Sequence, residues 1–356
     1  MKPANSPTAT VHLNNIQSNF DLVRSLAPRC RVMVVVKADA YGHGVVEVSQ
    51  QLSDADAFAV ARVTEGLELR QAGFDHPVVV LGGFINAGEQ KVCQKQNLIP
   101  VIHSEYQLHL LDNEQPAWLK INSGMNRLGF NPDHITGLAG KISQKNIVGI
   151  MSHFANADDP EHSSNSSQIK LFSQISDEIR QILNVDISAA IANSGGILGI
   201  DGSSMDWVRP GIMLYGGSPT GSVDTRLKAG MTLTAPVLGI NELQKGDSIG
   251  YGGLWTAHKH CRIAVVGLGY ADGYPREMPQ RTPVLLGGQR RQLVGRVSMD
   301  TCFVELEDND KVQVGDKVTF WGEELPIDEI ARCAGTVSYT LMSGLTRRVD
   351  KVYQRQ

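Results

Sequence analysis

The stretch Val-Met-Val-Val-Val-Lys-Ala-Asp-Ala-Tyr-Gly-His-Gly, residues 32–44, distinguishes between two folds open to this sequence. It begins with an unbroken apolar run, as expected of a parallel strand that is covered on both faces. An open doubly wound sheet would place a G-x-G-x-x-G turn directly after this first strand. Lys37 follows instead, and the stretch contains no such turn. The stretch therefore favours a closed (β/α)8 barrel.

The same alternation continues along the N-terminal part of the chain. Amphipathic segments, such as residues 14–26, 63–72 and 168–183, separate short apolar runs, and their apolar residues recur every three or four positions. Repeated alternation of this kind is typical of strands and helices around a parallel sheet. The predicted barrel strands are residues 32–36, 57–60, 78–81, 98–102, 117–121, 147–151, 187–192 and 207–214.

The pattern changes after Gly217. Residues 219–222, Pro-Thr-Gly-Ser, are typical of a linker, and the short runs beyond them are bounded by Gly and Asp, which indicates a mainly-β domain. We therefore predict an α/β + β protein, with a TIM-type barrel in residues 1–217 and a C-terminal β domain in residues 218–356. Residues 1–10 are candidates for packing with the second domain. The strands expected there are residues 233–240, 262–266, 283–286, 292–297, 302–306 and 317–320.

Composition and charge exclude several classes of function. The formal net charge is -4, whereas binding to nucleic acid or anionic lipid calls for a basic face. No apolar run approaches the ~20 residues that cross a bilayer, and residues 1–11 lack the apolar core of a secretory signal. The 5 cysteines form no C-x-x-C pair, which argues against a disulfide framework or a structural zinc. We expect a cytoplasmic protein without a metal that acts on a small neutral or zwitterionic ligand.

Polar side chains follow five of the predicted barrel strands, where reacting groups lie in enzymes of this fold. Lys37 closes the first run, Arg127 and His153 follow the fifth and sixth, Asn193-Ser194 follows the seventh, and Arg209 lies in the eighth. A lysine at the end of a buried strand is desolvated, which lowers its pKa and makes the amine a nucleophile toward a carbonyl cofactor. These placements predict an active site at the carboxyl ends of the strands.

Each of these residues also has an ordinary structural interpretation. Lys37 could extend its amine to solvent or pair with a carboxylate. The small residues of Asn193-Ser194-Gly195-Gly196 suit a phosphate at the start of a helix, yet they equally suit a plain helix cap. His258 and His260 share one strand face, but an exposed strand edge is a simpler interpretation than a metal site.

Longer blocks of the sequence resemble the alanine racemases. Residues 35–44 look like the segment to which that family attaches pyridoxal 5'-phosphate, and further blocks follow in the family's order over nearly the whole chain. The resemblance implies a barrel followed by a β domain, and the interconversion of L- and D-alanine. That activity would supply D-alanine for peptidoglycan or take part in alanine catabolism. The further blocks are residues 123–129, 152–155, 193–194, 209–211, 250–252, 269–273 and 295–300.

The resemblance also implies roles for individual residues. Lys37 would hold the cofactor and act as a base on one of its faces, and Tyr251 would be the base on the other. A phenol is a weak base at neutral pH, so Arg209 and His153 are candidates for lowering its proton affinity. Arg209 would also face the pyridine nitrogen and leave it unprotonated. The implied cofactor contacts are Lys37, Tyr41, Arg127, His153, Asn193, Ser194, Arg209, Gly211, Ile212 and Tyr339.

Arg127 would contact the cofactor and the substrate carboxylate, and its orientation would depend on Lys120. In many relatives the lysine at this position is carbamylated, so that an anion faces the arginine. This chain has Asn122 and Ser123 where Asp and Thr are common. An ordinary strand lysine is therefore the alternative for Lys120.

The resemblance further implies a homodimer with shared active sites. Tyr251, Met299 and Asp300 would enter the active site of the partner chain, and Met299 and Asp300 would contact the substrate there. Tyr270, together with Tyr339, would narrow the entrance, so that a methyl side chain fits and little more. Asp158 and Arg296 could line the approach; as an alternative they are solvated charges at the rim.

Three other functions share parts of this pattern. A pyridoxal phosphate carrier would resemble the barrel around Lys37, but such proteins lack the β domain that carries Tyr251. An amino-acid decarboxylase has the same two-domain plan, but it is longer and has a substrate-binding cysteine segment that is absent here. A racemase of broad specificity is the third alternative, and its periplasmic members would need a signal peptide.

Overall fold

The computed structural model describes residues 6–355. These residues form two compact units. The first, here called the barrel unit, contains residues 20–40 and 45–213. The second, here called the β unit, contains residues 6–19, 41–44 and 214–355. Each unit is described by itself.

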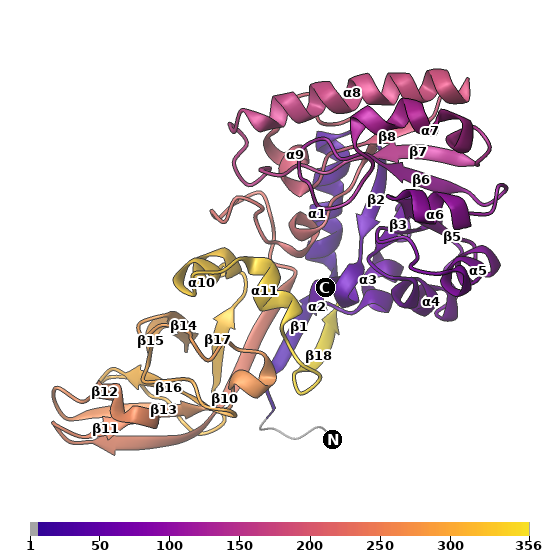
Figure 1. The fold of residues 1–356 in the computed structure, drawn as a ribbon. Helices are drawn as coiled ribbons and strands as arrows, with labels where there is room; N and C mark the ends of the chain where they lie inside the picture. Colours follow the sequence, from indigo (N-terminus) through magenta and orange to yellow (C-terminus); the bar gives the residue numbers. More distant parts are fainter. Residues whose placement is uncertain (1–5, 356) are drawn as a thin grey trace. The chain divides into compact units, whose positions relative to one another are not determined.

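The barrel unit is built around a closed barrel of parallel strands, so the predicted fold is confirmed (Figure 1). Each strand pairs with the next one along the chain, and the last pairs with the first through Arg31 opposite Trp207. Because all the strands run the same way, their carboxyl ends share one rim. The strands are β2 (Arg31–Val35), β3 (Ala57–Val60), β4 (Val78–Val80), β5 (Leu98–Ile102), β6 (Ala117–Lys120), β7 (Ile147–Met151), β8 (Ser188–Ala190) and β9 (Trp207–Val208).

Helices follow the barrel strands along the chain, and the longer ones bury one face. In α8, for example, Phe172, Ile175 and Ile179 recur at helical spacing and are buried. Burial of one such side chain contributes about 1.5–3 kcal/mol. The helices up to β9 are α1 (Leu13–Leu26), α2 (Lys37–Gly42), α3 (Val45–Gln51), α4 (Val63–Gln71), α5 (Ala87–Lys95), α6 (Glu105–Leu110), α7 (Ile135–Ile142), α8 (Ser164–Leu183) and α9 (Ser194–Gly199), with a 3-10 turn at Pro132–His134.

The eighth barrel strand is shorter than predicted. The apolar run at residues 207–214 forms a strand only over Trp207–Val208, and a 3-10 turn occupies Ile212–Tyr215. Pro210 has no N–H to donate, so the ladder cannot continue through it. Its carbonyl still accepts a hydrogen bond from Val35 N at 3.0 Å.

The β unit contains one eight-stranded sheet in the order β13-β16-β15-β14-β17-β10-β1-β18, and a two-stranded hairpin, β11-β12. The strand β1 lies between β10 and β18, so the start of the chain pairs with its end. The strands are β1 (Thr8–His12), β10 (Met231–Leu243), β11 (Ser248–Ile249), β12 (Trp255–Thr256), β13 (Cys261–Val266), β14 (Pro283–Leu286), β15 (Gln289–Val294), β16 (Cys302–Leu306), β17 (Lys317–Trp321) and β18 (Asp350–Gln354); the helices are α10 (Ile327–Cys333) and α11 (Ser338–Ser343).

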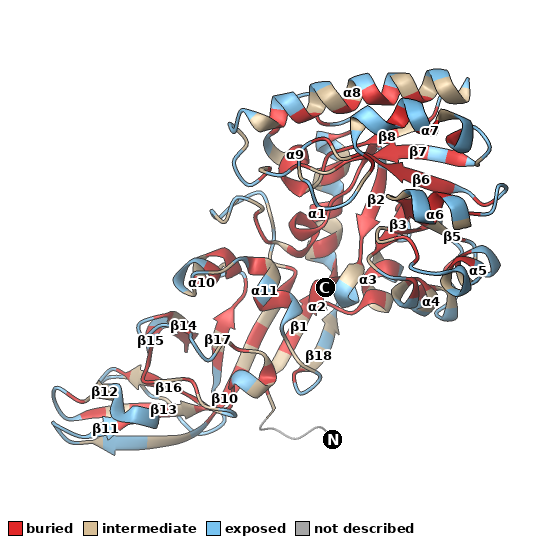
Figure 2. Ribbon diagram, viewed as in Figure 1, coloured by how far each residue is buried: buried red, intermediate tan, exposed pale blue. Residues whose placement is uncertain are grey.

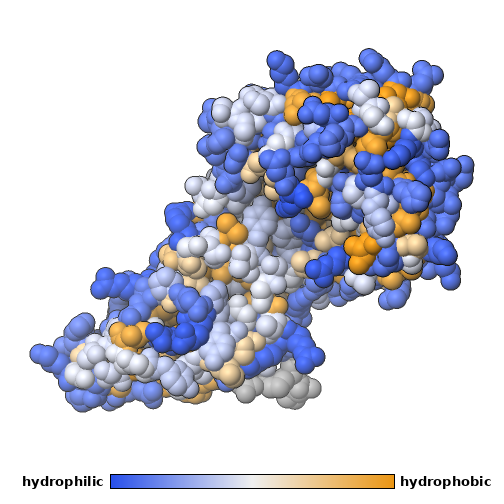
Figure 3. All heavy atoms as spheres, in the orientation of Figure 1, coloured by the Kyte–Doolittle hydropathy of each residue, from blue (hydrophilic) through white to orange (hydrophobic). Residues whose placement is uncertain are grey.

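Burial follows the strands in both units. Figure 2 shows the barrel strands and the inner faces of their helices as buried, with exposed residues on the outer helix faces. On the side seen in Figure 3, the outer surface is mostly hydrophilic, and apolar atoms show between the polar side chains of the barrel unit. Within residues 6–355, the longest apolar helical stretches fall short of what a membrane crossing needs.

Candidate active site

The segment that follows β2 is a left-handed turn. Residues 38–41, Ala-Asp-Ala-Tyr, have φ between 51° and 54°, a region that costs about 1–2 kcal/mol for each residue with a Cβ. Lys37 lies at the start of this turn, where the strand ends. The turn therefore bends the chain away sharply just after the lysine, and it requires support from its surroundings.

Glu65 supplies part of that support. One carboxylate oxygen accepts the N–H of Ala38 at 2.8 Å, and the other accepts the N–H groups of Ala61 and Arg62 at 2.7 and 3.0 Å. On the other side of the turn, Asp39 Oδ1 accepts the N–H of Val45 at 2.8 Å. The backbone beside Lys37 is thus tied to the end of β3 and to the start of α3.

Cationic side chains gather at the carboxyl rim around Lys37. Burial, and then the charge of Arg127, lower the pKa of Lys37, although Glu65 opposes this shift. Lys120 ends β6, is 9% exposed, and has its pKa lowered to about 7 by burial and by the neighbouring Arg209, Arg127 and Lys37. Within residues 6–355, neither lysine amine forms a hydrogen bond or an ion pair. Both amines therefore lose a proton more easily than the amine of an ordinary lysine does.

Arg209 is buried and is held by backbone carbonyl groups. It is 4% exposed, and its guanidinium donates to the carbonyl oxygens of Ala190 at 2.7 Å, Ser152 at 2.5 Å and Ile191 at 3.2 Å. Burial lowers its pKa to about 10, so it stays charged at neutral pH. Its fixed charge is available to orient an electron-rich ring atom of a ligand.

His153 follows β7 and faces Arg209. Its Nδ1 lies 3.3 Å from Arg209 Nη2, and burial together with Arg209 holds the pKa of His153 well below its usual range. The imidazole is therefore neutral, and because a guanidinium only donates, Nδ1 is the acceptor and Nε2 carries the proton.

The segment after β8 has a structural role that the sequence left open. Asn193 Oδ1 accepts the N–H of Gly196 at 3.0 Å, so Asn193 is the N-cap of α9. Ser194 Oγ accepts the N–H of Gly211 at 3.0 Å and that of Met213 at 3.4 Å, and it retains its own hydroxyl proton as a donor. Ile212, which begins the 3-10 turn, is 1% exposed. The hydrogen bonds of Ser194 thereby join the segment after β8 to the segment after β9.

Tyr41 and Tyr339 belong to the β unit, where they form an aromatic group with Tyr215. The Tyr41 ring stacks on Tyr215 with centroids 4.8 Å apart, and its centroid lies 5.9 Å from that of Tyr339. Burial, with a smaller effect of Tyr339, raises the pKa of Tyr41. Its phenol therefore stays protonated and can donate a hydrogen bond to an anion.

Tyr251 lies at the tip of the hairpin β11-β12 in the β unit. It begins a 3-10 turn between two glycines with positive φ, Gly250 at 74° and Gly252 at 76°. The side chain is 70% exposed. An ideal Cβ on Gly250 would lie 3.8 Å from the backbone of Arg296, which is half-buried. The hairpin therefore presents an aromatic hydroxyl outward, beside the loop that carries Arg296.

The loops of Tyr270 and Met299 are joined to each other. The N–H of Tyr270 donates to Ser298 O, and the N–H of Ala271 donates to Met299 O, both at 3.0 Å. Asp300 pairs with Arg348 at 2.7 Å, and Arg348 also pairs with the buried Asp272 at 3.1 Å. Tyr270 and Met299 are 39% and 52% exposed. The β unit thus brings three of the predicted residues into one exposed group.

Asp158 is exposed in the loop between β7 and α8 of the barrel unit. This position suits a residue that lines an approach to the site, and it equally suits a solvated charge.

Sequence reasoning did not identify Glu65, Gln168 or Arg348 as supporting residues. Glu65 contacts Ala38, Gln168 contacts Ser123 and Arg348 contacts Asp272 across 27, 45 and 76 positions, and these long-range contacts have no signal in the sequence.

The carboxyl rim combines a lysine amine of lowered pKa with further cations in a closed barrel. That combination is typical of a barrel enzyme that binds an anionic ligand and reacts through an amine. The comparisons with known proteins agree with this class. Residues 11–219 match the family model of the alanine racemase N-terminal domain, and residues 230–353 match that of its C-terminal domain. This chain belongs to the alanine racemase family.

Similarity to named relatives extends over nearly the full length. The alanine racemase of Nitrosomonas eutropha is 42% identical, covering 97% of this chain and 98% of its own. The structure of the biosynthetic alanine racemase from Pseudomonas aeruginosa is 39% identical, with a TM-score of 0.91 and coverage of 99% and 100%. The alanine racemase of Bartonella henselae, solved with covalently bound pyridoxal phosphate, is 29% identical, with a TM-score of 0.89 and coverage of 98% and 99%.

Proposed function

We propose that this chain is an alanine racemase that interconverts L- and D-alanine with pyridoxal 5'-phosphate held on Lys37. The observation that carries the proposal is the desolvated amine of Lys37 among cations at the carboxyl rim, in a chain of this family. A solved relative from Bartonella henselae has the cofactor bound covalently, which supports the same cofactor here.

The residues of the barrel rim fit that cofactor. The amine of Lys37 can condense with its aldehyde, and the guanidinium of Arg209 is fixed by three backbone carbonyls in a place suited to the pyridine nitrogen. Ser194 keeps a hydroxyl proton for the phosphate, and the phenol of Tyr41 stays protonated for the same use. Asn193, Gly211, Ile212, His153 and Tyr339 would complete the surroundings.

Racemisation needs two bases on opposite faces of the substrate. Lys37 Nζ would hold or release the proton on one face, and Tyr251 Oη would do so on the other. The bound cofactor supplies an electron-withdrawing ring that lowers the barrier to removing the α-proton. Because an arginine does not readily give up its proton, Arg209 keeps that withdrawal weak, which disfavours side reactions.

Two chains would form each active site. Tyr251 is 70% exposed on the tip of a hairpin, as expected of a side chain that acts in a partner's site. Met299 and Asp300 would enter with it and contact the substrate, and a twofold symmetric homodimer would repeat the arrangement. Tyr270, Tyr339, Asp158 and Arg296 would line the entrance and restrict it to small side chains. A cytoplasmic location is part of this proposal.

Arg127 would bind the substrate carboxylate, with Lys120 behind it. A pKa near 7 leaves a large share of Lys120 as the neutral amine, the form that reacts with carbon dioxide. Carbamylation would replace a cation with an anion among Lys37, Arg127 and Arg209, and would thereby relieve their mutual repulsion. We therefore include a carbamylated Lys120 in the proposal.

An amino-acid panel with chiral separation of the products tests the activity. We expect rapid interconversion of the alanine enantiomers and little turnover of larger amino acids. Release of carbon dioxide would instead indicate a decarboxylase, and binding of the cofactor without any turnover would indicate a carrier.

Mixing two inactive variants tests the shared site. Lys37→Ala and Tyr251→Phe should each lose racemisation, and exchange of their subunits should restore part of it because one site in the mixed dimer keeps both bases. A tagged pull-down that proves subunit exchange is the control. Proven exchange without any recovery would contradict sites made from two chains.

A further inference from the structure

Gln168 joins the two loops that carry Arg127 and His153. It lies near the start of α8 and is 3% exposed. Its Nε2 donates to Ser123 Oγ at 3.1 Å and to the carbonyl of His153 at 3.0 Å. Its Oε1 accepts the N–H of Ala155 at 2.9 Å. One buried amide thus connects the loop after β6 to the loop after β7.

A chain of hydroxyl groups extends this connection. Ser152 Oγ donates to the carbonyl of Ile121 at 2.8 Å, so its single proton is used there. The 2.7 Å contact between Ser123 Oγ and Ser152 Oγ must therefore be donated by Ser123. The order is Gln168 to Ser123 to Ser152 to Ile121, with each hydroxyl both accepting and donating. A buried network satisfied in this way holds a single geometry.

The network contacts the segments that carry Arg127 and His153. Its contact on His153 is to the backbone carbonyl, which leaves the imidazole free to face Arg209. Gly124, three residues before Arg127, also packs near Gln168, because a Cβ there would be in ordinary contact with Gln168 Cγ at 3.4 Å. Displacing the amide would therefore move both the His153 segment and the approach to Arg127.

We infer that Gln168 is a positioning residue that fixes the loops of Arg127 and His153 for binding of the substrate carboxylate. The inference rests on the proposed racemase function for its kinetic consequence, whereas its structural consequence is independent of that function. It assigns to α8 a part in the site that the strand ends alone do not provide.

The test replaces Gln168 by Met, which keeps the length of the side chain and removes its hydrogen bonds. The matched control is Gln90→Met, because Gln90 is also buried and donates to a glutamine, Gln115, at 2.9 Å, but on α5. In the holoenzyme, hydrogen exchange should rise at Ala155 and in residues 122–127 of the Gln168 variant only. Its KM for alanine, measured per bound cofactor, should rise about tenfold, the equivalent of one or two lost hydrogen bonds. Gln90→Met should stay within about twofold.

Ser123→Ala is the second variant, in case Gln168→Met does not fold. It removes one hydroxyl from the hydrogen-bonded chain and leaves the contacts of Gln168 to His153 and Ala155. Hydrogen exchange should therefore rise in residues 122–127, while the N–H of Ala155 stays protected. Unchanged exchange in every variant would overturn the network. Raised exchange with KM unchanged would overturn the positioning role. If the parent enzyme did not racemise alanine, the proposed function would fail, and the exchange data would still decide the inference.

Discussion

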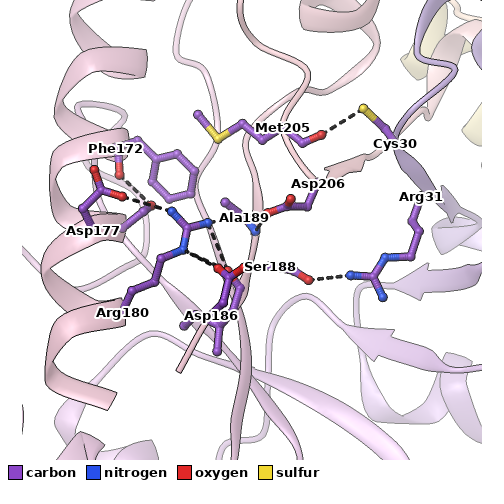
Figure 4. A network of polar contacts seen from close by, with 12 residues as sticks. Cys30, Arg31, Phe172, Asp177, Arg180, Asp186, Ser188, Ala189, Met205 and Asp206 are labelled. Atoms are coloured by element: carbon purple, nitrogen blue, oxygen red, sulfur yellow. Dashed lines mark hydrogen bonds and ion pairs between the residues drawn. The ribbon is translucent and has the colours of Figure 1, made fainter. Parts of the chain in front are cut away.

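The two rims of the barrel differ in whether their charged side chains have partners. At the carboxyl rim, the amines of Lys37 and Lys120 have lowered pKa values and no partner among the described residues. At the amino rim, Arg180 pairs with Asp177, Asp186 and Asp206 at 3.1, 3.3 and 3.6 Å and also donates to the carbonyl of Ile187 (Figure 4). The barrel therefore has paired charges near the starts of β8 and β9, and lysine amines without a partner at the ends of β2 and β6.

This difference separates what stabilises the barrel from what acts on a ligand. Paired charges near strand starts, such as Asp206 accepting the N–H of Ala189 at 2.7 Å, satisfy groups that would otherwise be unpaired (Figure 4). Unpaired and desolvated cations lower stability, so a fold retains them where they serve a ligand. Variants at the carboxyl rim should accordingly lower activity without lowering stability. Variants at the amino rim should lower stability without lowering activity.

The largest effect is expected from Lys37→Ala. Racemisation should fall more than about a thousandfold, because the group that holds the cofactor and moves a proton is lost. The visible absorbance of the lysine-bound cofactor should disappear. The thermal midpoint of the cofactor-free protein should not fall, since a desolvated cation has been removed. A yellow and active variant would contradict the assignment, and a large loss of stability would break the contrast between the rims.

The second-largest effect is expected to be a pH dependence of the free energy of unfolding that arises from Lys120. Between its folded-state pKa of about 7 and its ordinary value of 10.5, the unfolded chain holds a proton that the folded chain has released. The free energy of unfolding should therefore rise with pH across this window, by up to about 1.4 kcal/mol per pH unit. Denaturant unfolding at pH 7.5 and 9.5, in buffer free of bicarbonate, should show a smaller rise for Lys120→Met than for the parent.

Lys145→Met is the control for that comparison. The amine of Lys145 donates to the carbonyl of Leu111 at 2.6 Å and to Asn113 at 2.7 Å, away from the carboxyl rim. Its variant should keep the full slope of the parent. Equal slopes for Lys120→Met and the parent would show that Lys120 titrates as an ordinary lysine.

A smaller effect is expected at the amino rim. Arg180→Met should lower the free energy of unfolding by about 1–2 kcal/mol, because the carbonyl of Ile187 and three carboxylates lose a donor. Its kcat/KM should remain within about twofold of the parent. Urea unfolding and the racemase assay measure the two quantities. A tenfold loss of kcat/KM at unchanged stability would remove the distinction between the rims.

The smallest effect is expected on the outer surface. Lys141 and Glu105 form an ion pair of 2.9 Å with side chains that are 61% and 58% exposed. Lys141→Gln should change the free energy of unfolding by less than about 0.5 kcal/mol, and 1 M salt should abolish the difference. A change above 1 kcal/mol would mean that solvent exposure does not govern the strength of these pairs.

The barrel could be predicted because its signal is local. Each strand buried on both faces is a short apolar run, and the predicted runs overlap all the observed barrel strands. The eighth was predicted too long, because the apolar residues after Pro210 enter a 3-10 turn. The strands β1 and β18 were not predicted, because each is short and finds its partners across more than 200 residues. Pairing at that distance leaves no periodicity in either segment.

The gathering of side chains at the carboxyl rim was predictable where a strand end or a family motif marks the residue. Lys37, Lys120, His153 and Arg209 lie together at the rim because parallel strands end together. The capping role of Asn193 could not be separated from ligand binding, since the same side chain suits both. The buried amide of Gln168 was read as part of a helix face, because its three partners come from two other loops.

The left-handed turn after Lys37 has a consequence for the order of folding. Four residues with a Cβ in this conformation cost about 4–8 kcal/mol together, which is comparable to the whole stability of many domains. An isolated peptide of residues 37–44 would therefore not hold the turn. The turn depends on support from β2, β3 and the carboxylate of Glu65, so the segment that presents the reactive amine should not form before these elements are paired.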